Sequence, residues 1–205
     1  MHNRMRPKRT ALGTARIGVG VRSRNVSSPG GPLWSWLAPS LVLLTAMAVW
    51  GAVRYPGLPD RLPAHIGPDG IDAWTAKGVG AAFVPVFIYA GLTVVLTGCA
   101  ALATRITPQD ELPEPRNRWS GAAAAMTNRP ASGVSARRTA RSLLIMNALS
   151  GAGFLPLCWL QWRTPETAAV PAWVMPGTLT LFLLGLVPVG VACARDMAEK
   201  RTARA

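Results

Sequence analysis

Four long stretches of the chain contain no charged residue, and they constrain its fold more than any other feature. They cover residues 33–53, 78–104, 142–162 and 167–194, and each holds at least 20 mainly apolar residues. An α-helix rises about 1.5 Å per residue, so roughly 20 residues cross a hydrocarbon layer of about 30 Å. Four fully buried helices in a soluble core would leave too little of a 205-residue chain to cover them. The pattern therefore predicts an all-α membrane protein with four transmembrane helices.

The basic residues predict which side of the membrane each connecting segment faces. Lys and Arg number seven in residues 1–33, seven in 105–141 and four after residue 194, but three in 54–77 and one in 163–172. Because cytoplasmic flanks carry the excess of Lys and Arg, both termini and the central loop are expected in the cytoplasm, an N-in, C-in topology. Attraction to anionic lipids is a sufficient role for the net charge of +13. No basic helix is interleaved with aromatic residues, so nucleic acid is excluded as a partner.

These patterns predict five segments along the chain. They are a basic, disordered N-terminus at 1–32; a two-span unit at 33–104 with an outer loop at 54–77; a cytoplasmic loop at 105–141; a second two-span hairpin at 142–194; and a cytoplasmic tail at 195–205. Ala46-Met47-Ala48 has the form of a signal-peptide cleavage site, but cleavage there would remove the first span that the charge pattern requires.

Cysteines and small residues within the expected spans predict packing and not chemistry. Cys99, Cys158 and Cys193 have no CxxC spacing, which excludes a zinc knuckle or a disulfide framework, and we expect them to be small buried hydrophobes. Ala148, Gly151 and Ala152 form a small face in the third span, suited to a close helix contact within the chain or in a homo-oligomer. Asn147 is polar enough to bond across helices at this depth.

The outer loop at 54–77 is the one segment with clustered polar groups. Its four prolines and three glycines exclude a continuous helix and predict a stiff, turn-rich, ordered loop. His65, Asp69 and Asp72 are the candidate metal ligands, because one imidazole and two carboxylates could bind a divalent ion. Nothing in the loop has the spacing of a known metal motif, so we expect no metal, no cofactor and no catalytic residue.

The same loop resembles the signature of a bacterial membrane family called domain of unknown function 1648. That family's pattern is a span, the motif LP-x-x-IP-x-HF followed by G-x-x-D-x-W-x-x-K, and a second span; here Ile66 replaces the usual Phe. We refer to the matching positions as the signature residues: Leu58, Pro59, Pro63, His65, Gly70, Asp72, Trp74 and Lys77. The resemblance implies a multi-pass protein of the bacterial plasma membrane. Some relatives, with more spans, are immunity proteins against the sporulation-delaying toxin of bacilli.

Three classes of function remain open on the sequence. The first is a non-enzymatic membrane protein whose outer loop contacts an envelope peptide or protein, in toxin immunity or signalling; the absence of charge within the spans argues against a transporter or proton relay. The second is a loop-borne metal site or an accessory subunit of a membrane enzyme. The third is a structural or assembly subunit, with a homodimer formed through the small face of the third span. Within the loop we expect Asp72 and Trp74 to hold the shape and His65 to be the presented group.

Overall fold

The computed structural model describes residues 33–67, 70–112, 128–163 and 169–203. The expected disorder of residues 1–32 therefore lies outside the described residues, as does Asp69. The described chain is mostly helical, and four of its helices are long and apolar enough to cross a membrane. The all-α class and the four spans are confirmed.

The long helices follow the charge-free stretches, with proline or a capping side chain at their starts. A 3-10 turn at Leu33–Leu37 leads into α1 (Ala38–Arg54), and a short α2 (Val79–Ala82) leads into α3 (Val84–Arg105). Both α1 and α3 have proline in the first turn, where the missing N–H costs no helical hydrogen bond. After a 3-10 turn at Gln109–Glu111, α5 (Gly133–Gln161) and α6 (Val174–Thr202) complete the chain.

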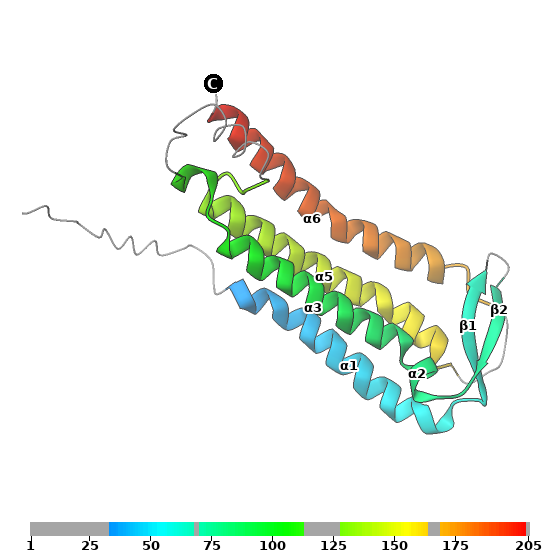
Figure 1. Ribbon diagram of the computed structural model, residues 1–205. Helices are drawn as coiled ribbons and strands as arrows, with labels where there is room; N and C mark the ends of the chain where they lie inside the picture. Colours follow the sequence, from blue (N-terminus) through cyan, green and yellow to red (C-terminus); the bar gives the residue numbers. More distant parts are fainter. Residues whose placement is uncertain (1–32, 68–69, 113–127, 164–168, 204–205) are drawn as a thin grey trace, which may run out of the picture. The chain divides into compact units, whose positions relative to one another are not determined.

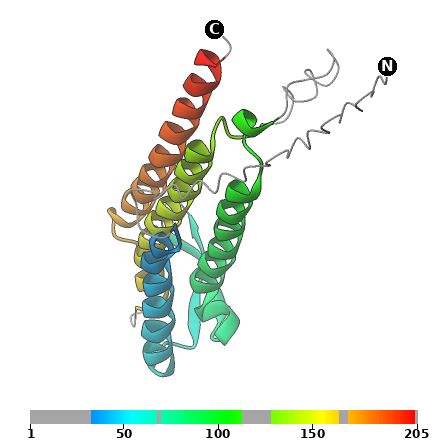
Figure 2. The ribbon, with the colours of Figure 1, turned by 90° about the vertical axis from the view of Figure 1, so that its left-hand side faces the viewer.

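Helix α5 is the central helix of the bundle. It packs against α1, α3 and α6, and α1 also touches α3. Helices α5 and α6 lie side by side in Figure 1 and again in the turned view of Figure 2. Many large apolar side chains point away from this packing, among them Val42, Val94, Leu183 and Val187. Outward-facing apolar surface on α1, α3 and α6 is what a lipid environment requires.

Two helices extend beyond the spans expected from the sequence. Helix α5 begins at Gly133 instead of residue 142, because the Ser132 hydroxyl caps it by accepting a hydrogen bond from Ser135 N at 3.1 Å. Helix α6 continues to Thr202 instead of residue 194. An ion pair at 2.8 Å between Arg138 and Glu199 joins the two extensions. We call this end of the bundle, with Arg105, Gly133 and Thr202, the basic end.

The opposite end of the bundle carries a β-hairpin, so we call it the hairpin end. Strands β1 (Arg61–Gly67) and β2 (Gly70–Ala76) form a two-stranded antiparallel sheet there (Figure 1). The sequence predicted an ordered loop at this place but not its strands. A 3-10 turn at Tyr55–Gly57 connects α1 to the hairpin.

The expectation that all three cysteines are buried was wrong for two of them. Cys158 is buried, but Cys99 and Cys193 are exposed on the outer faces of α3 and α6, and so would meet lipid. Trp162, the last residue of the charge-free stretch 142–162, is only 1% exposed and belongs to the main core cluster. The reason is that the short α2 folds over it, and the indole Nε1 donates a hydrogen bond to Ala82 O at 2.7 Å.

Candidate functional site

The hairpin's geometry depends on a bulge in β1 and on two glycines at its turn. Pro63 pairs with Trp74 and His65 with Ala73, so Ala64 is an unpaired residue in β1. Ile66 then pairs with Ile71, so Asp72 is unpaired in β2 and the original register returns. A bulge of this kind re-aims the following side chains, and both Ala64 and His65 are exposed. Gly70 has a φ of 126°, a conformation that glycine adopts at no steric cost.

His65 and Asp72 meet across the two strands. The distance between His65 Nδ1 and Asp72 Oδ1 is 2.6 Å, so the imidazole donates this hydrogen bond either as the neutral Nδ1–H tautomer or as the imidazolium. The side chains are 68% and 56% exposed. Gly67 leaves room for the carboxylate, since a Cβ there would come within 2.7 Å of Asp72 Oδ2. The pair is thus a preformed polar group on the surface of the hairpin.

The other face of the hairpin is fixed in the core of the bundle. Leu58 and Leu62 are buried in one cluster with Met47, Val86 and Trp162. Residues from α1, the hairpin, α3 and α5 therefore share a single hydrophobic core at this end. Burying a Leu side chain contributes about 1.5–3 kcal/mol, so Leu58 and Leu62 together hold the hairpin firmly against the bundle.

Lys77 ties the end of the hairpin back to its beginning. Its Nζ donates hydrogen bonds to Leu58 O at 2.8 Å and to Pro56 O at 3.2 Å, and it lies 5.3 Å from the centre of the Tyr55 ring. The Lys77 backbone N also donates to Asp60 O at 2.7 Å. The ammonium closes the loop by binding carbonyls that would otherwise need water.

The signature residues thus fall into distinct structural roles. Leu58 is buried in the shared hydrophobic core, Lys77 closes the loop, and Gly70 makes the turn. Trp74 is half-buried opposite Pro63, and Pro59 is half-buried between the 3-10 turn and β1. Pro63 is tolerated in a strand because β1 is an edge strand. Asp72, expected to hold the shape of the loop, contacts His65 across the strands.

The metal candidates and the small helix face are placed differently. The structure brings His65 and Asp72 together, and within its described ranges no three His, Cys, Asp or Glu side chains are arranged to hold a metal ion. In α5, Gly151 is buried against Tyr89 of α3, and Ala148 and Ala152 are half-buried. Asn147 is fully buried and accepts a hydrogen bond from Thr93 Oγ1 at 3.2 Å.

Sequence reasoning missed Gly67 and Trp162 as residues that shape this site. Nothing in the sequence singled out Gly67, because its requirement comes from the Asp72 carboxylate across the turn. The signal for Trp162 was present in its position at the edge of the third span. A tryptophan at that depth is typical of an interfacial anchor, so the sequence did not point to a contact in the core.

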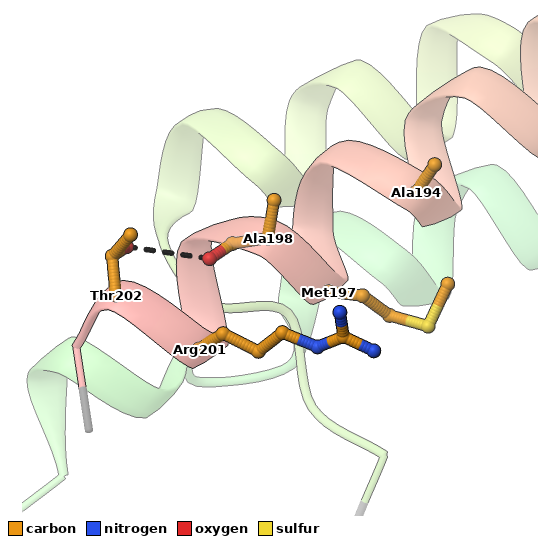
Figure 3. A pocket seen from close by; sticks show the side chains of 5 residues that line it. All are labelled: Ala194, Met197, Ala198, Arg201 and Thr202. Carbon is orange, nitrogen blue, oxygen red and sulfur yellow. Dashed lines mark hydrogen bonds between the residues drawn. The ribbon is translucent and has the colours of Figure 1, made fainter. Parts of the chain in front are cut away.

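A shallow hollow at the basic end offers little chemistry by comparison. It has a volume of about 420 Å³ and is lined by residues of the last turns of α6, shown in Figure 3: Ala194, Met197, Ala198, Arg201 and Thr202. The Thr202 hydroxyl donates a hydrogen bond to Ala198 O at 3.3 Å within the same helix. The hairpin end therefore remains the candidate site.

These features define a class: a multi-pass membrane protein in which a β-hairpin, packed on the hydrophobic core, covers one end of a four-helix bundle. Residues 42–89 match the family model described as "Domain of unknown function (DUF1648)", which confirms the domain identified by resemblance. The matched range runs from α1 through the hairpin to Tyr89 in α3 and covers under half of the chain. No curated protein and no solved structure gives a significant match to this chain.

Proposed function

We propose that this protein is a non-enzymatic receptor of the bacterial plasma membrane whose hairpin contacts a peptide or protein of the cell envelope. The hairpin end faces outward in this proposal, and the basic end faces the cytoplasm. The observation that carries it is the exposed His65–Asp72 pair on a hairpin whose other face is locked in the core. A polar pair held in one geometry suits recognition, because little conformational entropy is lost when a partner binds it.

The distribution of charge supports binding over transport or catalysis. The four charge-free stretches contain no ionisable Asp, Glu, Lys or Arg, whereas ion and proton pathways usually depend on such residues. At the hairpin, the carboxylate of Asp72 presents an acceptor, and Nε2 of the exposed His65 ring presents an acceptor in the neutral Nδ1–H tautomer or a donor in the imidazolium. A peptide partner in toxin immunity or signalling fits this patch, and a metal would need a further ligand.

A photo-crosslinking amino acid at Ala64 tests the proposal in intact cells. Ala64 is exposed beside His65, so we expect a defined adduct whose yield falls at least about tenfold with His65→Ala or Asp72→Ala, the effect of losing one charge-assisted hydrogen bond. The matched control places the crosslinker at Ala76, which is exposed at the far end of β2. An Ala64 adduct indifferent to His65→Ala, or no adduct at all, would refute the proposal.

A further inference from the structure

The basic end contains an arginine whose environment is incomplete. Arg141 is the last residue of α5 before the charge-free stretch 142–162, and its guanidinium carbon lies 5.1 Å from the centre of the Trp36 ring. Trp36 belongs to the 3-10 turn that precedes α1 and is 38% exposed. The indole therefore holds the guanidinium in a cation–π contact at the edge of the bundle.

Neighbouring acidic groups are already used by other cations. Glu199 lies 2.8 Å from Arg138 Nη1, and Asp196 lies 2.5 Å from Lys200 Nζ. Asp196 also accepts hydrogen bonds from Ser135 Oγ and, at 2.7 Å, from Ala131 N. Within the described ranges of the chain no carboxylate pairs with Arg141.

The Arg141 side chain also has an enclosed donor that lacks an acceptor. Its Nε is buried and has no hydrogen-bond partner among the described residues. Leaving a charged donor unsatisfied costs more than the roughly 1–3 kcal/mol of a neutral one. One turn earlier on the same face, Arg137 adds a second positive charge. This patch, Trp36 with Arg141, therefore has a positive charge that an anion would neutralise.

We propose that Trp36 and Arg141 bind the phosphate of an anionic phospholipid. The residues lie where the apolar part of α5 begins, which is the depth of lipid headgroups. A guanidinium offers planar, paired donors to phosphate oxygens, and stacking on Trp36 fixes their direction. A net negative lipid is favoured over a zwitterionic one, whose own ammonium group would be repelled by Arg141 and Arg137.

Native mass spectrometry of the full chain released from detergent tests this site. The probes are phosphatidylglycerol and phosphatidylcholine with identical acyl chains, titrated separately. We expect the wild type to retain phosphatidylglycerol preferentially, and Arg141→Gln to weaken that binding about fivefold, the attraction that one Arg exerts on an anionic lipid surface. Trp36→Leu should weaken it less, because the charge stays while its positioning is lost.

Arg195→Gln is the matched control, since it removes one exposed positive charge from the same end without touching Trp36. Its phosphatidylglycerol binding should stay within about twofold of the wild type. If Arg141→Gln is not monodisperse, Arg141→Lys replaces it and should also bind less lipid, because an ammonium lacks the planar fork. Equal binding by the wild type and both Arg141 variants, or an equal loss with Arg195→Gln, would overturn the proposal. So would equal retention of the two lipids by the wild type.

Discussion

At the scale of single residues, Gly151 has the least room for a side chain among the described glycines, because it packs against Tyr89. A Cβ on Gly151 would lie 2.3 Å from the Tyr89 hydroxyl and 2.4 Å from Cζ. The Tyr89 ring is itself fully buried, its hydroxyl donates to Ser40 O at 3.3 Å, and its ring packs 5.8 Å from that of Phe154. The ring therefore cannot move aside without breaking these contacts.

We predict that Gly151→Ala destabilises the protein by about 1–3 kcal/mol, the usual cost of an extra methyl group in a filled core. The midpoint of denaturant unfolding in detergent micelles should fall accordingly. Gly98→Ala in α3 is the matched control, because nothing lies within 4 Å of its Cβ position and alanine favours the helix. A Gly151→Ala midpoint as high as that of Gly98→Ala would mean that α3 and α5 are farther apart here.

Sequence reasoning could find the small face of α5 but could not say what it touches. The spacing of Ala148, Gly151 and Ala152 left an internal contact and a dimer contact equally open. Tyr89 lies over Gly151 because of the position of α3 along the axis of α5, and no local sequence pattern specifies that position. The pairing of His65 with Asp72 was hidden for a similar reason, since it depends on the register of two strands that the sequence did not predict.

At the scale of elements, the hairpin is held by the burial of Leu58 and Leu62 and by the hydrogen bonds of Lys77. Prolines and glycines in the outer loop pointed to turns, and proline within a run usually argues against a strand. The edge position of β1 removes that objection, because an edge residue can lack an N–H without breaking the ladder. The helices were easier to predict, since an apolar stretch of about 20 residues without a charge is typical of a membrane span and of little else.

Replacing Lys77 with methionine should loosen the hairpin while leaving the helices intact. Two charge-assisted hydrogen bonds to Leu58 O and Pro56 O disappear, and methionine keeps the apolar stem. We expect the β1 amides to exchange with deuterium about tenfold faster or more, which is the local effect of losing roughly 1.5 kcal/mol. Arg201→Met at the basic end should leave β1 exchange unchanged. Unaltered exchange in Lys77→Met would show that Leu58 and Leu62 alone hold the hairpin.

At the scale of the whole molecule, the two ends of the bundle have opposite characters. The hairpin end is closed by a shared apolar core under the strands, whereas the basic end is joined by the ion pair between Arg138 and Glu199 and by hydrogen bonds between α6 and residues 128–135. The end with Arg105, Arg137, Arg138 and Arg141 is suited to anionic headgroups. The fold thus separates a surface that we assign to partner recognition from one that we assign to lipid.

The predicted orientation can be tested with single cysteines at the two ends. Cys158 is fully buried and can stay, whereas Cys99 and Cys193 are exposed and are replaced by serine. In this background, Ala64→Cys marks the hairpin end and Arg201→Cys the basic end, and both positions are exposed in the native chain. Ser132 would be a poor marker, since its hydroxyl caps α5.

A membrane-impermeant maleimide applied to intact cells should label Ala64→Cys at once and Arg201→Cys only after permeabilisation. The physical reason is that segments rich in Lys and Arg stay on the cytoplasmic side, and losing Arg201 alone leaves that bias intact. The reverse labelling would establish the opposite orientation, with the His65–Asp72 pair in the cytoplasm. That result would refute the proposal of an envelope partner but not that of the lipid site.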